Sequence, residues 1–342
     1  MARMRRVPPV GAVALFSVFL LTLAWQQGQA FAFGSAGDPA QEPVKAYTPA
    51  TPAVGAGDTQ APKAENSIRF AVIGDTGTGD GHQRDVANAL ANARSRFPLE
   101  FVVMMGDNLY SGNREKDYVK AFEVPYKALL DAGVKFYATL GNHDNPNENL
   151  YKPFNMNGQR YYTFKPAKAS VRFFSLDSNY VDRKQLDWLD KELVASGSDW
   201  KIMFFHHPLY SSGETHGSAE EQRQQLEPVF VKYGVNVVLS GHEHFYERIK
   251  PQKGIAYFIV GNSAKLRRGD LLKTDLTAKG WDRGYAFMLV EIVGDDLYFN
   301  VLSEKGETID AGSIHRTGKI EQSPERSTQP VVPGTPAPKN QQ

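Results

Sequence analysis

The sequence contains no cysteine among its 342 residues, and this absence excludes two kinds of structure. Neither a disulfide bond nor a thiolate metal site can form, so any metal ion must be held by histidine, carboxylate, amide or phenol groups, which favour harder cations. Charge of one sign is not in excess either, because 39 Lys and Arg stand against 38 Asp and Glu, a formal net charge of +1. This balance argues against a nucleic-acid partner bound through bulk electrostatics.

Only one stretch of the chain is long and apolar enough to enter a membrane, and it lies near the N-terminus. Three arginines in the first six residues precede a mostly apolar run over residues 7–25, and the small-residue pattern Ala30-Phe31-Ala32 follows. This layout predicts a secretory signal peptide at 1–32, cleaved after Ala32, and a periplasmic or secreted protein. In the alternative interpretation the run is an uncleaved membrane anchor, since it is only slightly shorter than a bilayer span.

Composition divides the rest of the chain into three parts. Residues 33–66 are rich in Ala, Pro, Gly and Thr and predict a flexible linker, and residues 321–342 are rich in Pro, Ser and Gln and predict a disordered tail. The folded part is then 67–320, the size of one large domain. A hydrophobic content of 41% is enough for a sizeable core.

Short β-rich runs alternate with helical patterns inside this folded part. We expect strands at 68–73, 101–105, 136–140, 171–175, 201–205, 235–239, 256–260, 285–293 and 296–302. We expect helices at 82–97, 118–132, 183–196 and 219–233, the second of them broken near Pro125. Strands and helices alternate in the first part of this region, and strands follow one another without long helices in the last part. This order predicts an α/β fold in which two sheets pack face to face and helices lie outside.

Five of the expected strands end in clusters of Asp, Asn or His. In chain order the clusters are Gly74-Asp75, Gly106-Asp107-Asn108, Gly141-Asn142-His143-Asp144, His206-His207 and Gly241-His242-Glu243-His244. Each cluster alone is typical of a turn or a satisfied histidine. In open α/β sheets, however, sites form beyond the carboxyl ends of the strands, so all five clusters can converge on one edge.

Together the clusters contain the ligands of a two-metal site. Phosphoryl chemistry with two metal ions needs ions about 3.5–4 Å apart and a bridging ligand, which a carboxylate such as Asp107 can supply. The other ligands would be imidazole, carboxylate or carbonyl oxygen. His242 and His244 are two residues apart, so in an extended segment they would face the same way and one ring could address each metal.

In this order the five clusters resemble the sequence blocks of the calcineurin-like metallophosphoesterases, over roughly residues 68–245. The first block has Gly77 where many members carry a histidine two residues after the aspartate. Tyr110 instead stands three residues after Asp107, which is the mark of the purple acid phosphatases, in which a tyrosine binds ferric iron. In size and layout the chain is closer to their small, tartrate-resistant type.

The resemblance implies a four-layer α/β/β/α sandwich of two mixed sheets flanked by helices. It implies an exported acid phosphatase that hydrolyses phosphate monoesters of small substrates by attack of a metal-bound hydroxide. Its cofactors would be Fe(III) and a divalent ion, which is Fe, Zn or Mn. The ferric ion would be held by Asp75, Tyr110 and His244, and the divalent ion by Asn142, His206 and His242. Asp107 would bridge both ions, and His207 would line the pocket beside them.

The resemblance also implies residues on the substrate side. Asn142 and His143 would contact the substrate, and His143 would give a proton to the leaving group. Asp144 either orients His143 or closes a turn. His216 either contacts the substrate phosphate or is a solvated loop histidine.

Two other functions stay open. A phosphodiesterase or nucleotide hydrolase would use the same metal ions with a different pocket. A non-catalytic exported protein that binds phosphate or an adhesion partner would keep the fold with a degenerate site, although no ligand position is visibly lost. Arg267 and Arg268 could contact a substrate phosphate. A charged pair in an expected loop is more often solvated, so we place both outside the site.

Overall fold

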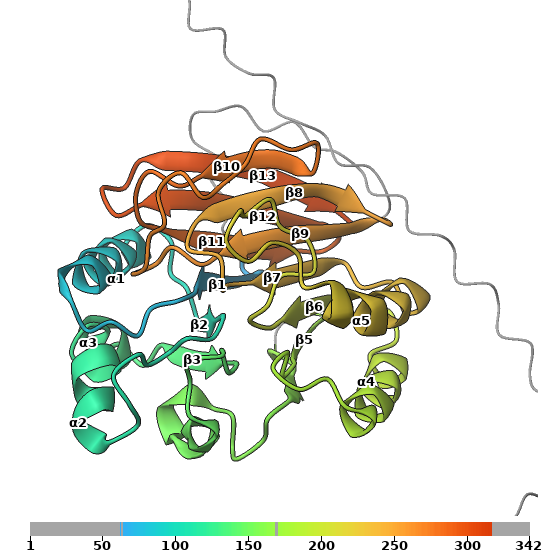
Figure 1. Cartoon of the computed structure of the whole chain (residues 1–342), viewed down its shortest axis with the longest axis horizontal. Helices are drawn as coiled ribbons and strands as arrows, with labels where there is room; N and C mark the ends of the chain where they lie inside the picture. The colour runs from blue at the N-terminus through green and yellow to red at the C-terminus, as the bar shows by residue number, and fades with distance from the viewer. Residues whose placement is uncertain (1–61, 63, 168–169, 317–342) are drawn as a thin grey trace, which may run out of the picture. The chain divides into compact units, whose positions relative to one another are not determined.

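The computed structural model describes residues 62, 64–167 and 170–316 (Figure 1). The expected signal peptide and tail, and all but a few residues of the expected linker, lie outside the described residues. Within these ranges, no helix has the length and apolar character needed to cross a membrane.

The elements follow one another as an alternation that later becomes a series of strands. The helices are α1 (Gly81–Arg94), α2 (Glu115–Tyr118), α3 (Lys127–Asp131), α4 (Arg183–Ala195) and α5 (Glu220–Lys232). The strands are β1 (Ile68–Ile73), β2 (Phe101–Met104), β3 (Lys135–Ala138), β4 (Tyr162–Phe164), β5 (Val171–Ser175), β6 (Trp200–Phe204), β7 (Val237–Ser240), β8 (Tyr246–Gln252), β9 (Ile255–Val260), β10 (Thr277–Trp281), β11 (Ala286–Val293), β12 (Asp296–Ser303) and β13 (Thr308–His315).

The strands form two mixed sheets, as predicted. The first has the order β13-β12-β11-β1-β2-β3, and the second has the order β10-β8-β9-β7-β6-β5-β4. Strands β1, β2 and β3 run parallel in the first sheet, and β5, β6, β7 and β9 run parallel in the second. Among them β1, β2, β7 and β9 have a neighbouring strand on each side, and they are nearly continuous apolar runs because a strand in the middle of such a sheet is covered on both faces.

The two sheets pack face to face around aromatic side chains. Phe70 of β1 stacks on Phe101 of β2 with ring centres 5.3 Å apart, and the edge of Phe173 from β5 meets Phe70 at 5.0 Å. All three rings are buried. Burial of each contributes about 1.5–3 kcal/mol relative to an exposed ring, so this contact holds the two sheets at a fixed distance.

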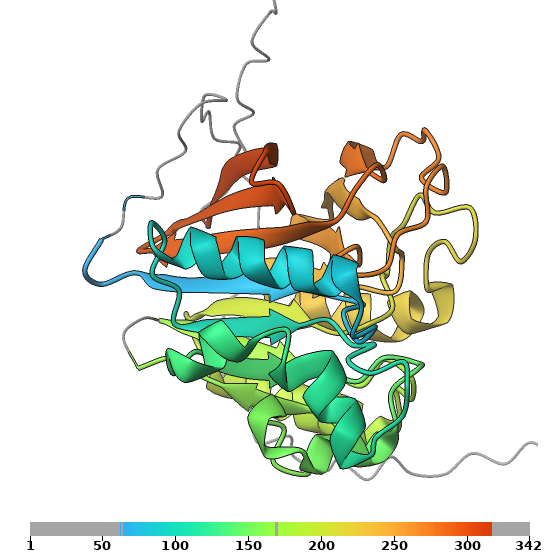
Figure 2. The ribbon, with the colours of Figure 1, turned by 90° about the vertical axis from the view of Figure 1, so that its left-hand side faces the viewer.

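Helices cover the outer face of each sheet. Val86 and Leu90 of α1 pack in one apolar cluster with Ala71 of β1 and Val102 of β2. Leu189 of α4 and Phe230 of α5 pack in another with side chains of the second sheet, which include Phe174, Met203 and Val238. Figure 1 shows α1, α2 and α3 on one side of the sheets and α4 and α5 on the other, and Figure 2 looks onto the face that α1 covers. The α/β/β/α arrangement predicted from the sequence is confirmed.

The helix expected at 118–132 is broken near Pro125, as predicted, but its first part is the end of α2 and a separate turn. Between α2 and α3 lies a π-helical turn at Val119–Glu123, in which the Val124 N–H donates to the carbonyl of Val119 at 2.9 Å. Pro125 has no N–H to donate to the carbonyl of Ala121 four residues earlier, and its ring crowds that carbonyl. The side-chain amide of Gln83 donates to the Ala121 carbonyl at 2.6 Å instead, so the break also attaches α1 to this segment.

The carboxyl ends of the parallel strands of both sheets meet at one edge. Strands β1, β2 and β3 lead into the clusters of Asp75, Asp107 and Asn142, and β6 and β7 lead into those of His206 and His242. His206, from the second sheet, donates from Nδ1 to the carbonyl of Met105, which follows β2 of the first sheet, at 2.8 Å. The functional clusters of the two sheets are therefore in direct contact.

Candidate metal centre

Two acidic residues stand at equivalent turns after β1 and β2. Asp75 and Asp107 have φ angles of 55° and 52°, in the left-handed region that residues other than glycine rarely adopt. The turns are tied together, because Asp75 N–H donates to the carbonyl of Gly106 and Gly77 N–H donates to that of Asp107, both at 3.1 Å. Strain of this kind is retained where the surroundings fix the side chain, and both carboxylates here are buried.

Asp107 is enclosed by the loop after β3. The backbone N–H of His143 donates to its Oδ1 at 3.0 Å. Gly141 passes so close that a Cβ at this position would lie 2.1 Å from the same Oδ1. Only glycine fits there, because any Cβ would overlap both the carboxylate and the backbone nitrogen of Asp107.

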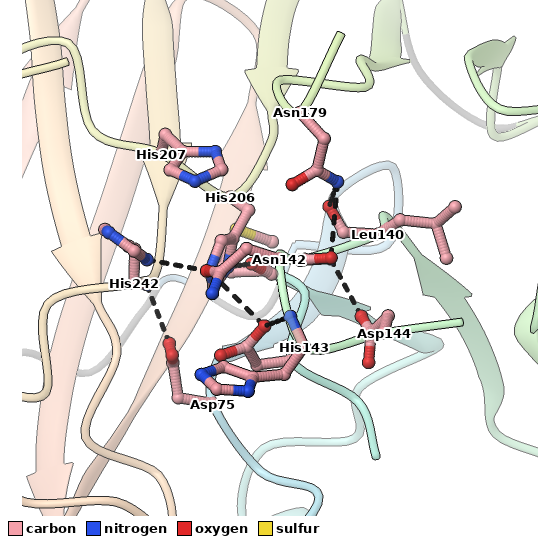
Figure 3. A network of polar contacts seen from close by, with 12 residues as sticks. Asp75, Leu140, Asn142, His143, Asp144, Asn179, His206, His207 and His242 are labelled. Carbon is pink, nitrogen blue, oxygen red and sulfur yellow. Dashed lines mark hydrogen bonds and ion pairs between the residues drawn. The ribbon is translucent and has the colours of Figure 1, made fainter. Parts of the chain in front are cut away.

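A first group of ligand atoms surrounds His206, which is buried (Figure 3). Because its Nδ1 donates to Met105, its Nε2 is left with a lone pair. This Nε2 lies 2.9 Å from Asn142 Oδ1 and 3.4 Å from Asp107 Oδ1. It also lies 3.0 Å from His242 Nδ1. Side chains from both sheets therefore direct their lone pairs into the same small space.

A second group of ligand atoms surrounds Asp75. Its Oδ1 accepts a hydrogen bond from the Tyr110 hydroxyl at 3.3 Å and lies 3.5 Å from His244 Nε2. Asp75, Asp107 and His244 each offer an atom, and these atoms lie within 4.8 Å of one another. Asp107 therefore belongs to the second group and also contacts His206 of the first.

His242 and His244 enter different groups, as expected, but for a different structural reason. The extended segment that was predicted for them is not present, because β8 begins only at Tyr246. His242 has a φ of 69°, and its backbone N–H donates to Asp75 Oδ2 at 2.9 Å. A turn, and not the alternation of a strand, separates the two rings.

The carboxylates of Asp75 and Asp107 are buried close to each other and to the Tyr110 hydroxyl. Burial, and then the neighbouring Asp107 carboxylate, raise the pKa of Asp75 well above its usual range. Burial, and then the carboxylates of Asp75 and Asp107, raise the pKa of the Tyr110 phenol. Grouped acceptors of this kind are costly to bury unless a positive charge joins them.

The imidazoles are held in the neutral form that binds metals. Burial lowers the pKa of His206 well below its usual range, and burial and the neighbouring His206 lower that of His242. The pKa of His244 falls to about 4 through burial and through the positive charges of Arg267 and Lys265. Neutral imidazole with carboxylate, amide and phenol oxygen is a donor set that suits two hard or borderline metal ions, and the site fits them.

His143 stands at the open side of the centre. His143 is exposed, and the centre of its ring lies 5.0 Å from the centre of the Tyr110 ring. Among the described residues, no contact joins the Asp144 carboxylate to the His143 ring. Its carboxylate accepts from Gly141 N–H at 2.8 Å and from Leu109 N–H at 3.0 Å, which favours the turn-closing interpretation.

His216 lies over the first group of ligand atoms. The sequence alone left open whether it contacts the substrate phosphate or is a solvated loop histidine. Its ring stacks on that of His242 with centres 4.2 Å apart. The loop that carries His216 is fixed by buried Glu243, whose Oε1 accepts from Gly217 N–H at 2.7 Å. His207 also contacts the first group, with its ring 4.5 Å from His242 and its Nδ1 2.9 Å from Ser178 Oγ.

Two cations of the segment after β9 reach the site. The sequence pattern placed Arg267 outside it and gave no reason to single out Lys265. Arg267, expected to be solvated, has Nη1 3.4 Å from His216 Nδ1 and 3.6 Å from Glu243 Oε2. Lys265 Nζ lies 4.4 Å from the ring centre of Tyr110. Arg268 is exposed, as expected. Only the tertiary fold brings these cations to the five clusters, so no local signal identifies them.

Gly77 cannot be replaced by the histidine that the first block often carries. A Cβ at Gly77 would lie 2.3 Å from the carbonyl carbon of Asn108, because the turns after β1 and β2 touch there. The Tyr110 hydroxyl reaches Asp75 instead.

Comparison with known proteins gives one family and a consistent set of relatives. The family described as calcineurin-like phosphoesterase matches residues 68–246. Purple acid phosphatase 7 of Arabidopsis thaliana is 25% identical over 289 residues, which cover 74% of this chain and 88% of the relative. Tartrate-resistant acid phosphatase type 5 of Homo sapiens is 28% identical over 239 residues, which cover 58% of this chain and 73% of the relative.

Solved structures share the fold at lower identity. A purple acid phosphatase from yellow lupin seeds superimposes with a TM-score of 0.61 and 17% identity, covering 75% of this chain and 54% of that chain. GAP50, the anchor in the inner membrane complex of Plasmodium, gives a TM-score of 0.64 with 21% identity, covering 75% of this chain and 91% of that chain.

Replacement of Gly141 by alanine tests whether the enclosure of Asp107 matters for metal binding. We expect Gly141→Ala to weaken metal binding at least about 10-fold, because the new methyl group must displace Asp107 Oδ1. Metal content after dialysis against graded chelator measures this. Gly81→Ala is the control, since a Cβ there meets only the end of Arg84 at 4.0 Å. A Gly141→Ala protein that retains its metal as tightly as the control would contradict the account.

Proposed function

The chain belongs to the calcineurin-like phosphoesterase family, and on this premise we propose that it is a two-metal acid phosphatase that hydrolyses phosphate monoesters of small molecules. One observation carries the proposal. Ligand atoms from both sheets form two adjacent groups, one around His206 with Asn142 and one around Asp75 with His244, and the buried Asp107 carboxylate lies close to both. The names of the relatives, which are acid phosphatases, support the same class of reaction.

The ligand assignment follows the two groups. Asn142, His206 and His242 would hold one ion, and Asp107 would bridge to the other. Asp75, Tyr110 and His244 would hold that second ion. When bound, two metal ions neutralise charge on phosphoryl oxygens and lower the pKa of water to near neutrality.

Iron(III) is the ion that we propose for the group with Tyr110. A phenol is a poor ligand until a highly charged cation draws off its proton, and the nearby carboxylates alone raise its pKa. A hard trivalent ion overcomes this, whereas the amide and imidazoles of the other group suit a divalent ion, Fe, Zn or Mn.

His143 is the residue that we propose as proton donor. It is exposed at the open side of the centre, and its backbone N–H is fixed on Asp107. A proton from its ring would go to the oxygen of the leaving alcohol as the bond from phosphorus to that oxygen breaks. Asn142 and His216, which border the same space, would contact the phosphate oxygens.

A leaving-group series tests the reaction and the donor together. The wild-type protein should hydrolyse 4-nitrophenyl phosphate at least about 10-fold faster than bis(4-nitrophenyl) phosphate. His143→Ala should slow aryl phosphates by about 100-fold where the leaving phenol is a poor one, and by much less where it is a good one, because only a poor leaving group needs the proton. Steady-state kinetics on metal-loaded protein measure both.

The control is His315→Ala, since His315 pairs with Asp296 at the far edge of the first sheet. A preference for the diester would instead assign a phosphodiesterase. Metal-loaded protein that turns over no phosphate ester would indicate a non-catalytic protein. Loss of metal in His143→Ala would contradict the donor role.

We propose further that the protein is exported, on the evidence of residues 1–32. A mature chain that begins at Phe33, determined by N-terminal sequencing of the protein from its native cell, is the expected result. A chain that retains residues 7–25 in the membrane fraction would support the uncleaved anchor.

A further inference from the structure

The segment that follows β9 is fastened to both sides of the centre. Ser263 exchanges hydrogen bonds with Gly74, one residue before Asp75, and Arg267 N–H donates to the carbonyl of His244 at 3.0 Å. Lys265 lies between these two attachments. Its backbone is therefore fixed relative to the proposed metal ligands, and its half-buried side chain extends over the ring of Tyr110.

The two cations of this segment differ in their partners. Arg267 is compensated by Glu243 at 3.6 Å and by Asp270 at 3.5 Å. Among the described residues, no carboxylate lies within ion-pair distance of Lys265, and its contact is the face of an aromatic ring at 4.4 Å. A half-buried ammonium group on a ring face retains capacity for three hydrogen bonds and attracts an anion.

The position of Lys265 specifies where such an anion would lie. Tyr110 borders both Lys265 and His143, with ring centres of Tyr110 and His143 5.0 Å apart. In the proposed reaction His143 meets the leaving oxygen, so the remainder of the leaving group continues past His143 and over Tyr110. The Lys265 ammonium group lies 4.4 Å from the centre of that same Tyr110 ring, so it borders the surface that the leaving group would cross.

We propose that Lys265 is a specificity-determining residue that binds a second phosphate carried by the leaving group. The inference rests on the proposed function, and it selects monoesters whose leaving group is itself phosphorylated over those with a neutral leaving group. Lys265 would act by direct contact with this second phosphate, and the scissile phosphate would remain with the metal ligands and His216.

The test compares substrates that differ only in the second charge. We expect wild-type protein to hydrolyse 4-(phosphonomethyl)phenyl phosphate with a kcat/KM about 10-fold above that for 4-methylphenyl phosphate. Lys265→Gln should abolish this difference chiefly through KM, and Lys265→Arg should retain most of it. Lys135→Gln is the matched control, because exposed Lys135 begins β3 at the end opposite the site.

A binding measurement keeps the test independent of turnover. Calorimetric titration of the metal-loaded protein with 1,4-phenylenebis(methylphosphonate) and with 4-methylbenzylphosphonate should give the same roughly 10-fold selectivity, lost in Lys265→Gln. If Lys265→Gln weakens the binding of both phosphonates equally, or changes the metal content of the protein, then Lys265 acts through Tyr110 and the assignment is overturned. Selective binding by a protein without turnover would leave Lys265 assigned and reject the proposed phosphatase.

Discussion

The carboxylate of Asp107 is confined between two groups of ligand atoms, and the arrangement of the centre depends on that confinement. A left-handed turn directs the side chain into the edge where the sheets meet, Gly141 packs closely against the carboxylate, and the His143 N–H donates to its Oδ1. Burial makes this position unfavourable for an uncompensated negative charge. Two metal ions would compensate such a charge, which would explain both the strain and the burial of Asp107.

The packing of the sheets sets the distance between the two groups. One group draws its imidazoles from the second sheet and its amide from the first, and the contact of His206 with the Met105 carbonyl joins them. The aromatic contacts of Phe70 and Phe173 fix the sheets farther inside. Because interiors pack densely, a small shift of one sheet would separate the groups, and a rigid core therefore preserves ligand geometry.

Much of this architecture is predictable from the sequence, for identifiable reasons. Central strands are covered on both faces, so their apolar runs are unambiguous, and the polar residues that end them are conspicuous. Edge strands β4 and β10 are only partly buried and were missed, as were edge strand β13 and strand β8, which contains Pro251. The turn at His242 and the approach of Lys265 depend on contacts between distant segments, which sequence periodicity does not encode. The ligand roles themselves stay predictions.

Metal content and visible absorption of the purified protein, compared with those of Tyr110→Phe, test the two-metal centre most directly. The account predicts two metal ions per chain, at least one of them iron, and a violet to pink colour from a phenolate bound to Fe(III) that disappears in the variant. An active wild-type protein that is colourless and free of iron would contradict the assignment of Tyr110, and an active protein with a single ion per chain would contradict the bridging role of Asp107.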